Sequence, residues 1–231
     1  MTTGSELPST LPPEVRALAL RLGATGSPSL ACVTLTQSGT MREGPADRFA
    51  RFSAKQRIDL RRPNFAWRAR TGQLGCISVT DAMRDGEACL EVRLLGLLRI
   101  AALRGGEEAA KGEVMRYLAE LAWAPDAILL NPTLSWQVVD DRRLRLAAGS
   151  GAARAEVELG LDGEGRIASV EASDRPRREG DCFVARPWRG RFMDYRRHEG
   201  RWLPFAGEVG WQLEGRWFTA WRGSIGSWSV A

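Results

Sequence analysis

The chain has little of what metal sites and catalytic triads are usually built from. Its 231 residues include a single histidine, His198, and four cysteines, none of which forms a CxxC pair. A zinc site of cysteine and histidine ligands is therefore not expected, and a Ser-His-Asp mechanism would have to use that one histidine. We expect neither a metal nor a cofactor. The sequence instead predicts buried free thiols in a reducing compartment at Cys32, Cys76, Cys89 and Cys182.

Long apolar runs are also missing. No segment approaches the roughly 20 apolar residues of a membrane-spanning helix, so we expect no integral membrane segment. The N-terminus, MTTGSELPSTLPPEVRALALRLGA, lacks the basic start and the apolar stretch of a signal peptide. These absences predict a cytoplasmic protein.

The excess of positive charge is small. The 33 basic residues exceed the 28 acidic residues by five. The arginines are spread along the chain and often alternate with apolar residues, which is the pattern of the solvated face of a sheet. We therefore expect no nucleic acid partner.

Most of the chain alternates apolar and polar residues with the period of a β-strand. Residues 1–12 form a polar Ser/Thr/Pro segment that we predict to be a flexible tail, and residues 13–231 are predicted to form a single domain. Strand signals cover residues 29–41, 48–60, 65–70, 77–83, 90–103, 136–139, 144–147, 155–161 and 166–172.

The last sixty residues hold six of the nine tryptophans and also read as strands. If Glu214 and Gly215 form a two-residue turn, Trp211 faces Phe218 and Glu208 faces Trp221 across a hairpin.

The period changes to that of a helix over residues 107–123. Val114, Leu118 and Leu121 fall at three- and four-residue steps, and acidic residues lie in the first turn, where they suit the helix dipole. A shorter helix is predicted over residues 13–22, with a proline in its first turn and Gly23 after its end.

Many antiparallel strands interrupted by one amphipathic helix predict an α+β fold. The architecture we expect is a large curved antiparallel sheet, a half-barrel, that wraps the central helix. A closed barrel is the weaker alternative, because its lumen would have no room for the helix.

Six blocks of the sequence resemble one bacterial family. In chain order they are VTLTQSGTMR, FAWRARTG, GEVMRYLAELAWAPDAILL, LSWQVVDD, PWRGRFMDYRRHEGRWLPFAGEVGW and FTAWRGSI. They are similar to the DUF6544 family, also catalogued as DUF6920, from about Leu11 to near the C-terminus. The resemblance implies a LolA-like half-barrel with helices in its concave face, a shape associated with binding lipids or other apolar molecules. It implies no particular reaction.

One stripe of the predicted helix carries candidate chemistry. Helical spacing places Glu113, Arg116 and Glu120 together, with Tyr117 beside them. On a solvated face these residues would form only a stabilising ion pair. Facing a concave sheet, Glu120 would have a raised pKa and act as acid or base, and Tyr117 would donate a hydrogen bond.

A second set of charged residues lies among aromatic neighbours near the C-terminus. Asp194, Glu208 and Arg222 are each expected to find a partner, because an isolated charge is costly in such surroundings. Glu208 with Arg222 or Arg191 would be a structural ion pair. Asp194 with Glu120 would be a carboxylate pair suited to acid/base work or to binding a hard cation.

The nine tryptophans allow two interpretations. Most are typical of half-buried strands, but four of them flank the candidate polar groups and would line an apolar ligand cavity: Trp123, Trp136, Trp211 and Trp221. Glu208 and Arg222 would then be polar anchors of that ligand.

Three functional hypotheses follow. The first is a protein that binds a hydrophobic small molecule or lipid between helix and sheet. The second is a cofactor-independent cyclase, isomerase or lyase, in which Glu120 or Asp194 supplies acid/base catalysis while Tyr117 and Arg116 stabilise negative charge. The third is an interaction module without a site. The sequence leaves the oligomeric state open.

Overall fold

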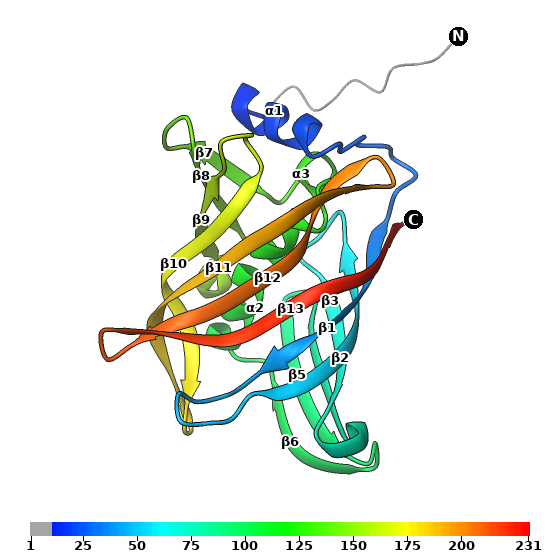
Figure 1. The fold of residues 1–231 in the computed structure, drawn as a ribbon. Helices are drawn as coiled ribbons and strands as arrows, with labels where there is room; N and C mark the ends of the chain where they lie inside the picture. Colours follow the sequence, from blue (N-terminus) through cyan, green and yellow to red (C-terminus); the bar gives the residue numbers. More distant parts are fainter. Residues whose placement is uncertain (1–10) are drawn as a thin grey trace.

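The computed structural model describes residues 11–231, which form one antiparallel sheet curved around a helix (Figure 1). The described residues contain 13 strands in that sheet, and the predicted α+β half-barrel is confirmed. The predicted flexible tail lies outside the described residues, except for its last two positions.

The bounds of the elements agree with most of the predicted strands. The strands are β1 (Cys32–Met41), β2 (Ala50–Asp59), β3 (Phe65–Thr71), β4 (Ile77–Arg84), β5 (Glu87–Leu94), β6 (Leu98–Arg104), β7 (Ser135–Val138), β8 (Arg143–Ala148), β9 (Ala155–Leu161), β10 (Ile167–Glu179), β11 (Cys182–His198), β12 (Arg201–Leu213) and β13 (Arg216–Val230). The α-helices are α1 (Pro13–Arg21), α2 (Glu107–Ala119) and α3 (Ala127–Leu130), and the 3-10 turns are η1 (Gln73–Gly75), η2 (Glu120–Ala122) and η3 (Gly151–Ala153).

The sheet is continuous from β6 at one edge to β7 at the other. The strands lie in the order β6-β5-β4-β3-β2-β1-β13-β12-β11-β10-β9-β8-β7, so the first and last strands of the chain pair in the middle. The segment that contains α2 follows β6 and precedes β7, and it therefore joins the two edges across the concave face (Figure 1).

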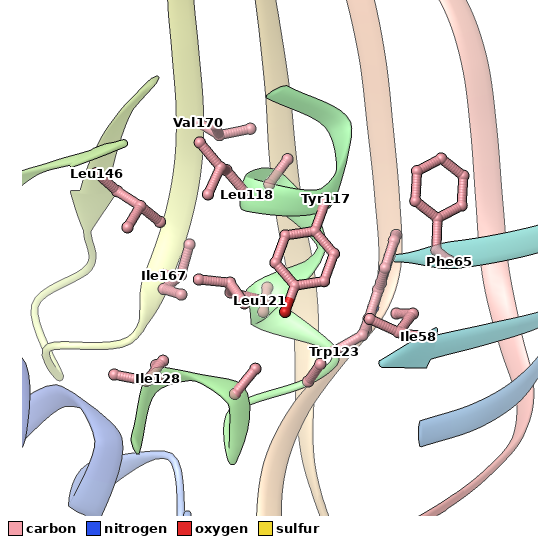
Figure 2. Packing of buried hydrophobic residues seen from close by; sticks show 14 of the residues in the cluster. Ile58, Phe65, Tyr117, Leu118, Leu121, Trp123, Ile128, Leu146, Ile167 and Val170 are labelled. Atoms are coloured by element: carbon pink, nitrogen blue, oxygen red, sulfur yellow. The ribbon is translucent and has the colours of Figure 1, made fainter. Parts of the chain in front are cut away.

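Helix α2 buries one face against one half of the sheet. Its packing is mainly on β9 and β10. Figure 2 shows Leu118 of the helix and Leu121 of the turn η2 directed toward Leu146, Ile167 and Val170, and all five are fully buried. Burial of each such side chain stabilises the fold by about 1.5–3 kcal/mol. Because α2 packs mainly on this half, room remains between the helix and the strands at the centre of the sheet.

The helix is shorter than the sequence predicted. Regular α-helix ends at Ala119, and the chain continues as the 3-10 turn η2 up to Trp123. Pro125 lies just beyond η2 and keeps the α-helix from continuing, because a proline disfavours α-helical geometry in the residue before it. The tighter turn moves Trp123 out of helical phase and onto the wall of the cavity described below.

A buried ion pair fixes the turn after η2. Asp126 has no exposed surface, accepts a hydrogen bond from the backbone N–H of Thr25 at 2.8 Å, and pairs with Nε of Arg201 at 3.0 Å. It thereby ties the segment before α3 to β12 and to the loop after α1.

All four cysteines are free. Cys32 is buried, Cys76 and Cys89 are half-buried, and Cys182 is exposed. The predicted burial is therefore wrong for Cys182, which lies just after the turn between β10 and β11. Among residues 11–231, no helix is both long and apolar enough to cross a membrane.

Candidate functional site

A cavity of about 330 Å³ lies between α2 and the central strands. Its lining comes from both ends of the chain and from α2, and the residues are Gln37, Met41, Arg42, Trp67, Val79, Asp81, Arg116, Ala119, Glu120, Trp123, Arg175, Trp188, Phe192, Val209, Ala220 and Trp221.

Aromatic rings form much of the cavity wall. Trp123 meets Phe192 edge-on with ring centroids 5.4 Å apart, and it meets Trp221 at 6.3 Å. Trp221 also stacks on Phe52 at 5.7 Å. Such contacts stabilise by about 0.5–1.5 kcal/mol beyond area burial, so the wall is preformed.

A glycine makes room for the ring of Trp221. A Cβ at Gly223 would come within 2.4 Å of that ring. A side chain at Gly223 would therefore push Trp221 away from the sheet.

The polar part of the lining is centred on Arg116. Its Nε pairs with Glu120 at 2.8 Å and its Nη1 with Asp81 at 2.5 Å. Glu120 is only 5% exposed, and it also accepts a hydrogen bond from Nε2 of Gln56 at 2.5 Å. The neighbouring carboxylates raise the pKa of Arg116 above its ordinary value. The predicted Arg116–Glu120 pair is present and faces the sheet.

Asp81 is a site residue that sequence reasoning missed. It lies on β4 between Val79 and Met83, with which it shares a face of the strand. A carboxylate in phase with apolar residues that point inward was a signal of a buried ion pair. Its partner on α2 could not be identified from the sequence.

The carboxyl group with the raised pKa is Glu113. Its Oε2 is enclosed without a hydrogen-bond partner among the described residues. Burial, reinforced by the nearby carboxylate of Asp81, raises its pKa to about 8, although Arg116 and Arg175 act in the opposite direction. Glu113 lines a second pocket of about 190 Å³ that shares Asp81 and Arg175 with the cavity. The sequence had assigned the raised pKa to Glu120.

Arg175 of β10 was also missed. Its guanidinium lies over the ring of Trp188 at 4.4 Å and near that of Trp211 at 5.4 Å. Its Nε is enclosed without a hydrogen bond, and no carboxylate of residues 11–231 forms an ion pair with it. Burial lowers its pKa. The register of β10 against β11 shifts between Ala172 and Arg175, and no sequence pattern announces that irregularity.

Tyr117 does not line the cavity. Its hydroxyl donates to the backbone oxygen of Asp59 and accepts from Nδ2 of Asn131, both at 3.0 Å. The side chain has no exposed surface, and burial raises its pKa above the ordinary value. Tyr117 is therefore held in the core, away from Arg116 and Glu120, and we place it among the structural residues.

The C-terminal acidic residues do not join the cluster on α2. Asp194 is exposed and pairs with Arg196 at 2.6 Å, so the carboxylate pair with Glu120 is not formed. Glu208 pairs with Arg222 at 3.3 Å, as the structural interpretation had it. The next residue, Val209, lines the cavity, and Glu208 therefore points to the opposite face of the sheet.

Two of the four tryptophans proposed for the cavity are in its wall. Trp123 and Trp221 line it, whereas Trp136 lies on β7 at the far edge and Trp211 lines the smaller pocket. Trp67 and Trp188 line the cavity although the sequence did not single them out.

Comparisons with known proteins place the fold. A family model described as "Family of unknown function (DUF6544)" matches residues 1–223. A LolA superfamily protein from Nitrosomonas europaea is similar with a TM-score of 0.51 and 8% identity, over 94% of this chain and 93% of that one.

A second similar structure is a putative outer membrane lipoprotein-sorting protein domain from Vibrio parahaemolyticus. Its TM-score is 0.53 at 9% identity, and 94% of this chain and 91% of that chain are covered. No curated protein matches the chain. These likenesses establish the LolA-like fold.

Proposed function

Because the chain belongs to DUF6544, a family of unknown function, its role must be inferred from the site, and we propose that it binds a hydrophobic small molecule or lipid. The observation that carries the proposal is the cavity of about 330 Å³, with tryptophan walls and a few charged groups at one side. Small-molecule sites are typically of this size and lined in this way. The lipoprotein-sorting description of the similar Vibrio structure is in line with a lipid ligand.

The charges in the lining favour an anionic head group. Arg42, Arg116 and Arg175 line the cavity, and Arg116 forms the ion pairs of both carboxylates in the lining. Arg42 donates to the backbone oxygens of Thr219 and Pro45, and no carboxylate in the described part of the chain forms an ion pair with it.

One uncharged donor also lies in the cavity. The amide oxygen of Gln37 accepts a hydrogen bond from Nε1 of Trp67 at 2.8 Å, so its amide nitrogen stays available in the cavity. We therefore propose an amphiphile whose carboxylate or phosphate group lies at Arg175.

Val209→Trp tests the cavity. The larger side chain would occupy the space between β12 and α2, so the affinity for decanoate is expected to fall at least about tenfold, which corresponds to ~1.4 kcal/mol. Isothermal titration calorimetry measures it. Met193→Trp makes a comparable change at an exposed position and should bind decanoate as the wild type does. Equal binding by Val209→Trp would contradict the proposal.

Arg175→Met tests the head group. A hydrogen bond to a charged group is worth about 1.5–3 kcal/mol, so the variant should bind decanoate and decyl phosphate at least about tenfold more weakly. Binding of decyltrimethylammonium should not weaken. Arg196→Met, which removes an exposed arginine, is the control.

The same titrations also test whether the ligand is an amphiphile and whether its head group is anionic. Tight binding of inorganic phosphate alone would show a site for a free anion and would contradict the amphiphile. Equal binding of the cationic and the anionic probe by the wild type would support the hydrophobic cavity and contradict the preference for an anionic head group.

A cofactor-independent enzyme remains the second candidate. The observation in its favour is Glu113 in the smaller pocket, where a pKa raised to about 8 would let it exchange protons near neutral pH. Tyr117 and Asp194 would have no part in this reaction. A ligand extracted from the purified protein and recovered unchanged after long incubation with it would remove this candidate.

A further inference from the structure

Two neighbouring turns at one end of the sheet expose leucines. Leu74 lies in η1 between β3 and β4, and Leu95, Leu97 and Leu98 lie at the tip of the hairpin of β5 and β6. These four side chains are between 63% and 106% exposed. We call them the leucine tips.

The two turns form one surface. The N–H of Leu95 donates to the backbone oxygen of Cys76 at 2.6 Å, which joins the tip of the β5–β6 hairpin to the end of the β3–β4 turn. Figure 1 shows both turns together at the lower end of the sheet, away from the loops around α1. β6 is an edge strand, and Ile100 on it is also exposed.

Folding does not account for leucine at two of these positions. Leu74 and Leu95 have φ of 55° and 52°, the left-handed region that costs a branched side chain free energy and that glycine or asparagine adopts more easily. Neither side chain gains burial in return. An exposed apolar group held in an unfavourable backbone conformation indicates a surface that is covered when the protein acts.

The charge around the leucine tips indicates what covers them. Residues 92–106 contain Arg93, Arg99 and Arg104 and no acidic residue. Glu91 pairs with Arg93, which leaves Arg99 and Arg104 as the unpaired positive charges of this hairpin among residues 11–231. Residues 60–80, which include the η1 turn, also lack acidic residues and carry Arg68 and Arg70 near the turn. Apolar side chains that project from a basic surface are the combination that binds anionic lipid interfaces.

We propose that the leucine tips dock the protein on the surface of an anionic lipid bilayer. The leucines would enter the boundary between head groups and acyl chains, and Arg70 and Arg99 would contact lipid phosphates. A second copy of the chain is the less favourable occupant, because a symmetric contact through this surface would bring the same positive charges together. The proposal is independent of the cavity, which lies on the concave face.

Leu74→Asn combined with Leu95→Asn tests this surface. Asparagine tolerates a positive φ, so the melting temperature should stay the same or rise, and a loss of binding could not be ascribed to unfolding. Sedimentation with vesicles of equal parts phosphatidylcholine and phosphatidylglycerol should show wild-type binding and at least about a tenfold weaker partition of the double variant. Vesicles of phosphatidylcholine alone should bind the wild type more weakly.

Leu20→Asn is the matched control, since Leu20 is an exposed leucine on α1 at the other end of the molecule. Its vesicle binding should equal that of the wild type. Wild-type protein that stays in the supernatant, or a double variant that sediments as the wild type does, would overturn the proposal. So would a dimer, seen by analytical ultracentrifugation, that the double variant abolishes, because that result would assign the surface to a second copy. In none of these cases would decanoate binding in the cavity be affected.

Discussion

Arg116→Met is expected to lower the free energy of unfolding by about 3–5 kcal/mol. The guanidinium is the shared partner of Asp81 and Glu120, at 2.5 Å and 2.8 Å. Without it, Gln56 is the only donor left to Glu120 among the described residues, and Asp81 has none. Two enclosed carboxylates would then face each other across an apolar cavity. Urea denaturation at neutral pH measures the loss.

Arg196→Met separates burial from ion-pair geometry. Arg196 and Asp194 form a pair at 2.6 Å, as close as the pairs of Arg116, but both side chains are exposed to solvent. Water screens such a pair, so the expected change in the free energy of unfolding is within about 0.5 kcal/mol. Losses of the same size for the two arginines would show that the cluster on α2 is solvated, and the account of the site would be wrong.

Stability is expected to fall as the pH rises through the range in which Glu113 titrates. Burial raises the pKa of Glu113 from 4.5 to about 8, so between these values the folded state keeps a proton that the unfolded state has lost. The contribution of the neutral carboxyl is therefore fully present below about pH 4.5 and is lost as pH rises to about 8. The groups that face it are Asp81 from β4, Arg116 and Glu120 from its own segment, and Arg175 from β10.

Glu113→Gln isolates this effect because glutamine resembles the neutral carboxyl. Between about pH 6 and about pH 9 the wild type should lose about 2–3 kcal/mol more of its free energy of unfolding than Glu113→Gln does, at ~1.4 kcal/mol for each pH unit. Urea denaturation at the two pH values measures it. Glu108→Gln, at an exposed position of the same helix, should follow the wild type. If the wild type had the same pH dependence as Glu113→Gln, Glu113 would not be the group whose pKa is raised by folding.

The sequence predicted the arrangement of the last hairpin only in part. The turn at Glu214 and Gly215 sets Trp211 opposite Phe218, as expected. A register shift between Val209 and Gly210 then places Glu208 opposite Arg222 instead of Trp221. A β-bulge adds a residue to one strand and breaks the period of two, and nothing in a single sequence marks where it occurs.

In the candidate site, the contact between residues close in sequence could be predicted, and the contacts between distant residues could not. The pair of Arg116 and Glu120 is four residues apart on one helix, and that spacing is readable from sequence. Asp81 and Arg175 reach the same cluster from β4 and β10, and their approach depends on the curvature of the whole sheet. Asp194 illustrates the opposite error. Its φ of 57° in an irregular stretch of β11 turns it to the surface, although its neighbours in the sequence are aromatic and apolar.

Native mass spectrometry of the protein with added decanoate tests the central claim most directly. We expect one bound decanoate on the wild type and on Met193→Trp, and none or far less on Val209→Trp, because only the last substitution fills the cavity. A wild type that carries no decanoate, or a Val209→Trp variant that carries as much as the wild type, would contradict the proposed binding site.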